Sequence, residues 1–416
     1  MKLMNIMCGL PKLSVYPKHS LMTKPICVSG KNLPPNSEIK LKTTLFCQKN
    51  RYNFTSLNLY KTTNNGFFST STHPTLDGSQ YTGCHPSGPV WSVRPQDGSR
   101  KRLWNENTSL PLTYIFKLFD SQNNLIGESS LIKYIKSPEV TRIGVSNGRF
   151  RGALYLPRLE KVEGGRRAII TIFGGMLEGR APEDMAAMLA GSGFVTFALA
   201  FYGGEGQPSE YTHVDIGLIE DCVDFLRSLP QVEDKRINLF GISKGADLSL
   251  CTAAFLGNKI RGTVAVNSFF GSFNGDTFYK NESVKWNGLD MKILNKGITS
   301  DQYCNIIRQF KEDPDKWIPV ERVDGPILAI KGLDDVTPTI EFAQIAQQRA
   351  KSRGKTNFEV IKYTGLGHLL EPANYPVCTS ARLFGWDIQY GGKNIQRHAL
   401  AQLDAWGRIL HFMNAK

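Results

Sequence analysis

From about residue 165 onward, short apolar segments alternate with helical ones, and this pattern constrains the fold most. The apolar segments read RAIITIFGG, FVTFALAFYGG, RINLFGIS, GTVAVNSFFG, PILAIKGLDD and FEVIKYTGLGH. Between them, Ile216, Ile219, Val223 and Leu226 recur at helical spacing. Strands that are apolar on both faces need cover on both sides. The pattern therefore predicts a mostly parallel, doubly wound α/β sheet.

The N-terminal part of the chain follows a different pattern. Between residues 13 and 134, strand-like runs such as IKLKTTL and TYIFKLF alternate polar and apolar side chains, and turn residues such as Asn64-Asn65-Gly66 separate them. This is typical of an antiparallel β-sandwich. A linker near residues 137–139 then divides the chain. We expect a β-sandwich domain at 13–140 and an α/β catalytic domain at 141–416.

Charge is distributed unevenly along the 416 residues. The chain has 50 basic and 37 acidic side chains; residues 1–140 hold 17 and 7 of them, and residues 141–416 hold 33 and 30. A basic field of this kind suits nucleic acid, an anionic membrane or a polyphosphate, and a plain solvated surface is the alternative. No window approaches the roughly 18 uninterrupted apolar residues of a membrane span. We expect no integral membrane association.

The cysteines and the chain ends indicate the cellular setting. Eight Cys are spread without a CxxC pair or a His at zinc-ligand spacing, so we expect reduced thiols and neither metal nor cofactor. The first residues, MKLMNIMCGLPKL, lack a secretory cleavage site. The last three residues do not form the peroxisomal signal Ser-Lys-Leu. The cytoplasm is the expected compartment, with mitochondria or peroxisomes as alternatives.

Gly241-Ile242-Ser243-Lys244-Gly245 is the sharpest chemical motif. It stands between the strand RINLF and the small-residue helix ADLSLCTAAFL. A nucleophile elbow needs this arrangement, because a tight turn exposes the Ser and flanking glycines let strand and helix approach closely. Gly144-Val145-Ser146-Asn147-Gly148 also matches GxSxG, but the strand FRGALYLP follows it. We interpret that second match as a hairpin turn and Ser243 as the nucleophile.

A nucleophilic Ser needs a base, and the base needs an orienting carboxylate. The strand PILAIKGL is followed by Asp334-Asp335, and FEVIKYTGLG is followed by His368. Both therefore stand after later strands, as a hydrolase with this elbow requires. Spacing does not separate Asp334 from Asp335, and one of them is available to brace the loop. The other six histidines lack this context: His19, His73, His85, His213, His398 and His411.

The oxyanion hole is expected from two main-chain segments. One donor is the backbone N–H of Lys244, which follows the nucleophile, and the other comes from the loop Gly174-Gly175-Met176 after RAIITIF. Glycines let the main chain approach a substrate carbonyl. A plain strand-to-helix turn is the alternative interpretation of that loop.

These motifs together resemble one known family. The elbow GISKGADLSL, the loop FGGMLEGRA, the passage GLDD…GLGHLLEPANYPVC and the closing WDIQYGGKNIQRHALAQLDAWGRIL are similar to the acyl-CoA thioesterase and bile acid-CoA:amino acid N-acyltransferase family. The resemblance runs from about Leu13 to Phe412. It implies an immunoglobulin-like N-terminal sandwich, an α/β-hydrolase domain and a triad of Ser243, Asp335 and His368, and so favours Asp335 over Asp334. The segment before GGMLEGRA is shorter than in the family, which leaves the second oxyanion donor open.

The resemblance also implies a fatty acyl-CoA substrate, hydrolysed to fatty acid and CoA through an acyl-serine. Family members that conjugate amino acids have Cys at the nucleophile position, whereas Ser243 resembles the thioesterase branch. The alternatives are an N-acyltransferase acting on glycine or taurine and a non-catalytic lipid-binding protein on a hydrolase fold. No nucleic-acid partner is expected, because residues 141–416 are nearly neutral. Part of the N-terminal charge is then expected to attract the CoA phosphates. Chain-length preference and oligomeric state have no signature in the sequence.

Overall fold

The computed structural model divides the chain into two compact units. It describes residues 9–47, 52–97, 102–103, 105, 107–158, 166–174, 183–203, 207–208, 212–232, 234–272, 275–285, 312–336, 340–383 and 386–415. The first unit contains Met1–Ile135, Glu371–Cys378 and Asn394–Leu400, and the second contains Lys136–Leu370, Thr379–Lys393 and Ala401–Lys416. Two short C-terminal segments thus fold with the first unit, which is therefore not continuous in the sequence as the expected domains 13–140 and 141–416 are.

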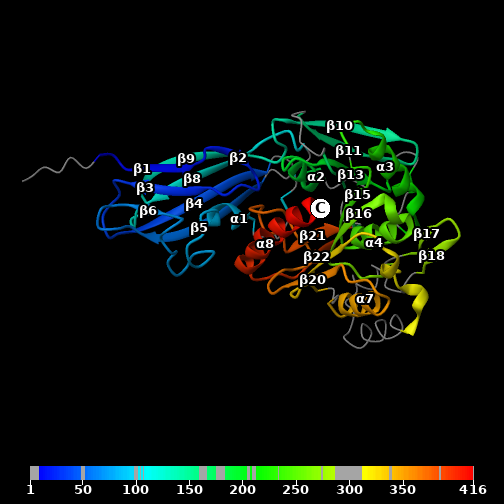
Figure 1. Ribbon diagram of the computed structural model, residues 1–416. Helices are drawn as coiled ribbons and strands as arrows, with labels where there is room; N and C mark the ends of the chain where they lie inside the picture. Colours follow the sequence, from blue (N-terminus) through cyan, green and yellow to red (C-terminus); the bar gives the residue numbers. More distant parts are fainter. Residues whose placement is uncertain are drawn as a thin grey trace, which may run out of the picture. The chain divides into compact units, whose positions relative to one another are not determined.

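An eight-stranded sheet forms the centre of the second unit (Figure 1). Its order is β10-β11-β13-β12-β15-β16-β19-β20. The strands are Val140–Asn147, Phe150–Pro157, Val195–Ala200, Ala168–Phe173, Ile237–Ile242, Ile260–Val266, Ile327–Gly332 and Phe358–Tyr363 in that order. β11 pairs antiparallel with β10 and β13, and the pairs from β13 to β20 are parallel. The mostly parallel sheet expected from the apolar segments is confirmed.

Helices cover both faces of this sheet. The helices α3 (Ile216–Ser228), α4 (Lys244–Leu256) and α7 (Ile340–Ser352) share one buried core with alternate side chains of the strands, such as Ile170 and Phe197. Thr196, which points to the opposite face, donates its hydroxyl to the carbonyl of Ala186 in α2 (Glu183–Ala190) at 2.7 Å. Side chains in a strand alternate between faces, so α2 covers the other side. The C-terminal helix α8 spans Ile395–Asn414.

Smaller elements complete the second unit. A three-stranded sheet joins β14 (Val214–Asp215), β17 (Thr277–Tyr279) and β18 (Glu282–Val284). A hairpin joins β21 (Ser380–Leu383) and β22 (Trp386–Gln389).

The first unit contains two sheets whose strands pair mostly antiparallel. One has the order β1-β3-β6, with strands Lys12–Tyr16, Cys27–Lys31 and Phe68–Ser69. The other has the order β2-β9-β8-β4-β5-β7, with strands His19–Leu21, Leu125–Tyr134, Leu112–Phe119, Glu38–Cys47, Tyr52–Lys61 and Arg94–Pro95. Ile39, Leu41, Thr43 and Leu45 are buried, whereas the residues between them, Lys40, Lys42 and Thr44, are more exposed, as the alternation in IKLKTTL predicts. Among the described residues up to residue 135, the only helix is α1 (Gly88–Trp91), which is a single turn.

Contacts within the first unit explain why two distant segments belong to it. Tyr81 and Trp91 form an apolar cluster with Val377 and Ala399. Arg102 and Glu371 form a buried, two-pronged ion pair, with one N–H···O contact of 2.8 Å. Paired hydrogen bonds of this type fix orientation as well as position.

Candidate active site

The GISKG segment forms a sharp turn between a buried strand and a helix. β15 is buried along its whole length, and α4 starts at the residue after Ser243. Ser243 has φ 60° and ψ −130°, a backbone conformation that non-glycine residues rarely adopt. Its N–H donates to the carbonyl of Val266 at 2.9 Å. This is the strained strand-to-helix turn that a nucleophile elbow requires.

Both glycines of this segment are required by close packing. A Cβ on Gly241 would lie 2.2 Å from the carbonyl oxygen of Gly245. A Cβ on Gly245 would lie 2.1 Å from the carbonyl oxygen of Ile172 in β12. The strand, the turn and the helix therefore approach to distances that only a hydrogen atom permits.

The second GxSxG segment has a different structure. Ser146 lies near the end of β10, opposite Arg151 of β11, and Gly148 has φ 57° at the turn. A Cβ on Gly144 would meet nothing within 4 Å. The hairpin predicted for this segment is confirmed.

His368 and Asp335 lie in direct contact. The imidazole Nδ1 is 2.8 Å from the carboxylate Oδ2, and both side chains are almost fully buried. The His368 ring also stacks on Tyr390, with centroids 5.3 Å apart and planes at 14°. The ring is therefore oriented by a carboxylate at one edge and by an aromatic face.

The neighbouring Asp334 has another role. Its Oδ1 accepts from the N–H of Gly365 at 3.2 Å, and its own N–H donates to the carbonyl of Leu366 at 3.0 Å. It braces the loop that leads to His368. The structure thus distinguishes the two carboxylates that the spacing did not.

Gly174 and Lys244, one residue from each of the two main-chain segments expected to hold an oxyanion, lie beside Ser243. A Cβ on Gly174 would lie 3.3 Å from the backbone N of Lys244 and 3.4 Å from Ser243 Oγ. The chain after β12 therefore passes beside the Ser hydroxyl and the expected donor. Gly175 and Met176 lie outside the described residues.

A buried polar cluster under the elbow was not found from the sequence. Asp247 of α4 accepts from the Ser268 hydroxyl at 2.6 Å and from the N–H groups of Phe269 and Phe270 at 2.9 and 3.1 Å. Burial raises the pKa of this carboxyl, while these hydrogen bonds favour its ionised form.

Lys331 belongs to the same cluster. It is fully buried in β19, and its Nζ donates to the carbonyl of Ser268 at 2.7 Å. Burial lowers its pKa to about 7, against the opposing attraction of Asp335 and Asp247. A Lys that interrupts the apolar segment PILAIKGL was the available signal in the sequence.

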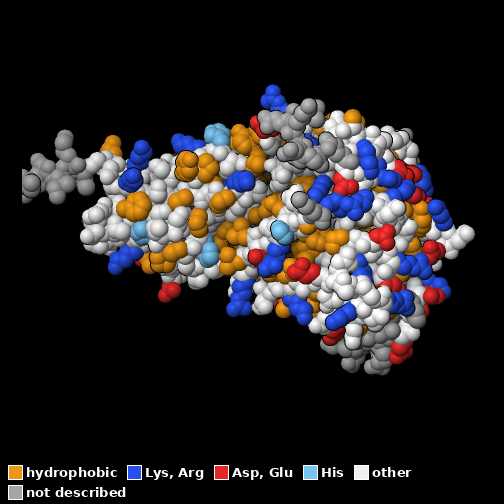
Figure 2. All heavy atoms as spheres, viewed as in Figure 1, with side chains coloured by type: hydrophobic (Ala, Val, Ile, Leu, Met, Phe, Trp, Pro, Cys, Tyr) orange, Lys and Arg blue, Asp and Glu red, His pale blue; other side chains and the backbone are white. Residues whose placement is uncertain are grey.

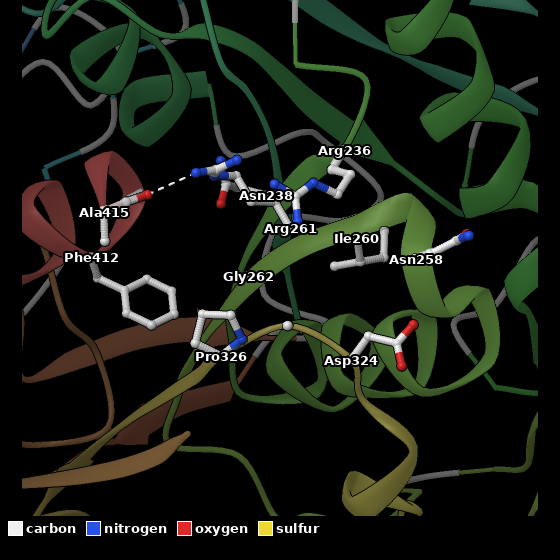
Figure 3. A pocket seen from close by; sticks show the side chains of 11 residues that line it. Arg236, Asn238, Asn258, Ile260, Arg261, Gly262, Asp324, Pro326, Phe412 and Ala415 are labelled. Atoms are coloured by element: carbon white, nitrogen blue, oxygen red, sulfur yellow. Dashed lines mark hydrogen bonds between the residues drawn. The ribbon is translucent and has the colours of Figure 1, made fainter. Parts of the chain in front are cut away.

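A cavity of about 250 Å³ lies at the amino ends of the parallel strands, at the other end of the strands from Ser243 (Figure 3). It is lined by residues that precede or begin β15, β16 and β19, together with the end of α8: Arg236, Asn238, Asn258, Ile260, Arg261, Gly262, Asp324, Gly325, Pro326, Phe412 and Ala415. Arg261 donates to the carbonyl of Ala415 at 2.8 Å and pairs with Asp234. Its guanidinium thus caps the last turn of α8. Ser243, Asp335 and His368 follow the carboxyl ends of their strands, where open α/β sheets hold their sites.

The sheet order, the elbow at the end of β15 and the His–Asp contact after β19 and β20 define an α/β-hydrolase fold. Comparison with known families agrees with this class and narrows it. Residues 214–416 match the family described as "BAAT / Acyl-CoA thioester hydrolase C terminal", and residues 23–147 match "Acyl-CoA thioester hydrolase/BAAT N-terminal region". The chain belongs to this acyl-CoA thioester hydrolase/BAAT family, and it is an enzyme of the thioester hydrolase class.

Named relatives match nearly the whole chain. The mouse (Mus musculus) "Peroxisomal succinyl-coenzyme A thioesterase" is 30% identical over 412 residues, which cover 96% of this chain and 95% of the relative. The mouse "Acyl-coenzyme A thioesterase 5" is 31% identical over 418 residues, 97% and 96% of the two chains. The rat (Rattus norvegicus) "Acyl-coenzyme A thioesterase 2, mitochondrial" is 30% identical, with 97% and 88% covered.

Among solved structures, an esterase of Pyrobaculum calidifontis is similar at 17% identity and a TM-score of 0.41, covering 66% of this chain and 85% of the esterase. Acetyl xylan esterase 1 of Thermoanaerobacterium is similar at 15% identity and a TM-score of 0.34, covering 64% of this chain and 81% of that esterase.

None of the helices in the described part of the chain has the length and apolar character needed to cross a membrane.

Proposed function

We propose that this chain hydrolyses fatty acyl-CoA to a fatty acid and CoA, with Ser243 as nucleophile, His368 as base and Asp335 as the orienting carboxylate. The observation that carries the proposal is the strained elbow: Ser243 at φ 60°, with the Gly174 backbone beside its hydroxyl. The His368–Asp335 contact of 2.8 Å supports the roles of the other two residues. The substrate class is proposed from the family and from the names of its relatives.

The first step is acylation of the Ser. With Nδ1 donating to Asp335, the Nε2 atom of His368 is the acceptor for the hydroxyl proton. Ser243 Oγ attacks the thioester carbonyl carbon as that proton leaves, and the carbonyl oxygen becomes an oxyanion. The N–H of Lys244 and the main chain of the Gly174–Met176 loop are the proposed donors to that oxygen.

Collapse of the intermediate breaks the carbon–sulfur bond. The CoA thiolate leaves and takes the proton from His368; a thiol with a pKa of about 8.5 is a better leaving group than an amine. Water then gives a proton to His368 and attacks the acyl-serine, which releases the fatty acid and restores the hydroxyl. An oxygen ester is less prone to aminolysis than a thioester, so water is the favoured acceptor.

The test compares the two serines that share the GxSxG pattern. Ser243→Ala is expected to abolish release of free thiol from acyl-CoA and labelling by a fluorophosphonate probe. Ser146→Ala, in the hairpin, is the matched control and is expected to retain both. Turnover by Ser243→Ala at the wild-type rate would refute the assignment, and absence of labelling in the wild type would favour the non-catalytic alternative.

The acyltransferase alternative differs only in the acceptor. Incubation with acyl-CoA and glycine or taurine, followed by mass spectrometry, separates the two reactions. Free fatty acid as the sole product supports hydrolysis. An N-acyl amino acid formed in proportion to thiol release would assign the chain to the transferase branch.

We further propose that residues 13–140, nearly all of which lie in the first unit, form an immunoglobulin-like β-sandwich and that the basic charge of this segment attracts the CoA phosphates. Two sheets with alternating buried side chains support the first point. On the face seen in Figure 2, basic and acidic side chains are interspersed over the second unit, in line with its near balance of charge, and the first unit presents basic side chains with fewer acidic ones. The cytoplasm remains the proposed compartment, and immunolocalisation of the untagged protein tests it against mitochondria and peroxisomes.

A further inference from the structure

We propose that Asn267 is a positioning residue, which holds the strand end that leads to Asp335 and the loop that carries His368 in a fixed relation to each other. This inference rests on the proposed function, because it assigns a role to a residue that acts through the triad. Asn267 follows β16, and no proposed catalytic group lies on that strand.

The backbone of Asn267 is held at the centre of the carboxyl edge of the sheet. β16 lies between β15, which precedes Ser243, and β19, which precedes Asp335. The N–H of Asn267 donates to the carbonyl of Ile330 in β19 at 2.9 Å. The preceding residue, Val266, accepts the N–H of Ser243 at 2.9 Å. One short segment therefore contacts both the nucleophile turn and the acid-bearing strand.

The Asn267 side chain joins this segment to the end of β19 and to the loop that carries His368. Its Oδ1 accepts from the N–H of Gly332 at 2.9 Å, three residues before Asp335. Its Nδ2 donates to the carbonyls of His368 at 2.8 Å and Gly367 at 3.1 Å. The amide thus bonds the His368 main chain on one side and the end of β19 on the other.

These bonds require the chemistry of a primary amide. The side chain is fully buried, so no water replaces a lost partner without rearrangement. Two facing carbonyl oxygens demand an N–H₂ group, and one facing N–H demands an oxygen. Asn267 also has φ 50°, a conformation that Asn and Gly tolerate better than other residues. An Asp would place an oxygen against the two carbonyls, and a branched apolar side chain would satisfy none of the three groups.

The next residue extends the same junction to the helix of the elbow. The Ser268 hydroxyl donates to Asp247 in α4, and the Ser268 carbonyl accepts from Lys331 in β19. The segment after β16 is therefore bonded to all three elements that bring the proposed catalytic groups together. Small shifts of a catalytic group lower the rate strongly while leaving distant binding contacts intact.

The test uses two substitutions with different physical consequences. Asn267→Gly removes the side chain, and glycine adopts the positive φ without strain. Asn267→Asp keeps the shape of the side chain but replaces the N–H₂ donor with an oxygen acceptor. Asn238→Asp is the matched control, because Asn238 is also a buried amide of this sheet and lies in β15 at the opposite edge. The substrate is an acyl-CoA, and kcat is expressed per active site, counted by complete labelling with a fluorophosphonate.

Both Asn267 variants are expected to lose about 10- to 100-fold in kcat per labelled site, with a parallel loss in the labelling rate and a KM changed by less than about threefold. Asn238→Asp is expected to keep kcat within about twofold. Partial unfolding lowers the number of labelled sites and not the rate per site, so poor folding of a variant does not imitate the expected result.

Wild-type kcat per site in Asn267→Gly would overturn the inference, as would a loss confined to the number of sites and to heat stability. The proposed function has a separate outcome. If Ser243→Ala retains turnover, the proposed function fails whatever the Asn267 variants do. If Ser243→Ala is inactive and Asn267→Gly behaves as wild type, only the positioning role is refuted.

Discussion

The two GxSxG segments allow one substitution to be tested in two structural settings. Gly241 and Gly144 are the first glycines of identical patterns, and neither has a positive φ. A Cβ on Gly241 would lie 2.2 Å from the Gly245 carbonyl oxygen and 2.6 Å from the Ala246 Cα, whereas a Cβ on Gly144 would meet nothing within 4 Å. Gly241→Ala and Gly144→Ala therefore differ in packing and not in backbone conformation.

The magnitude follows from the overlap. Contacts of a Cβ below 3.0 Å are essentially never observed, so α4 and β15 must separate by at least 0.8 Å (3.0 − 2.2) in Gly241→Ala. Overpacking of this kind costs about 3 kcal/mol in the free energy of unfolding, because the obstructing atoms are backbone. That corresponds to a fall of roughly 6 to 12 °C in the unfolding midpoint. Since the first turn of α4 follows Ser243, kcat is expected to fall about 100-fold.

The assay measures thiol release from acyl-CoA and the midpoint of heat inactivation for both variants. Gly144→Ala is expected to retain wild-type kcat and to be unchanged or more stable by about 0.5 kcal/mol, because Ala restricts the unfolded chain. Equal behaviour of the two variants would refute the packing argument, and a fully active Gly241→Ala would also remove the close approach of strand and helix as a requirement of the site.

Three further predictions concern charge. Asp335→Asn is expected to lower kcat by about 10³- to 10⁴-fold in the thiol-release assay. Asp334→Asn, which alters only the bond from Gly365, is expected to lower it less than about tenfold, and equal losses would contradict the division of roles. Burial lowers the pKa of Lys331 from its ordinary 10.5 to about 7, so the folded state binds fewer protons than the unfolded state between these values and wild-type stability rises with pH across that window. In urea unfolding, the free energy of unfolding of Lys331→Met is therefore expected to exceed that of the wild type most near pH 7 and below, by up to about 5 kcal/mol. A difference that does not depend on pH would contradict the buried charge. Finally, if residues 1–140 attract the phosphates, KM for acyl-CoA is expected to rise with salt more steeply than KM for an uncharged ester. An equal rise of the two KM values would support the alternative that this charge only forms a solvated surface.

Local sequence patterns were sufficient to predict much of the second unit. Burial on both faces forces a parallel strand to be apolar throughout, so RINLF and PILAI marked β15 and β19, and Ile216 to Leu226 marked α3 by helical spacing. The same logic separated Ser243 from Ser146, because a helix follows one and a strand follows the other. His368 was located because it follows the last strand of the sheet.

Features that depend on contacts between distant segments required the tertiary structure. Adjacent carboxylates share one spacing, so only the turn after β19 directs Asp335 to His368 and Asp334 to Gly365. Glu371–Cys378 folds with the first unit through Arg102 and Trp91, which lie more than 250 positions away.

Asn267 shows the limit most clearly. In the sequence it is a single Asn after a strand, and no residue at helix or strand spacing from it indicates its hydrogen-bond partners. Its three side-chain partners lie at the end of β19 and in the loop that carries His368, 65 to 101 positions further along the chain. The sequence alone determined the six parallel strands of the sheet and which residue types stand at its carboxyl edge, because periodicity and turn chemistry are local. The folded chain decided how those residues are held against one another, because hydrogen bonds between loops depend on distances that no local pattern encodes.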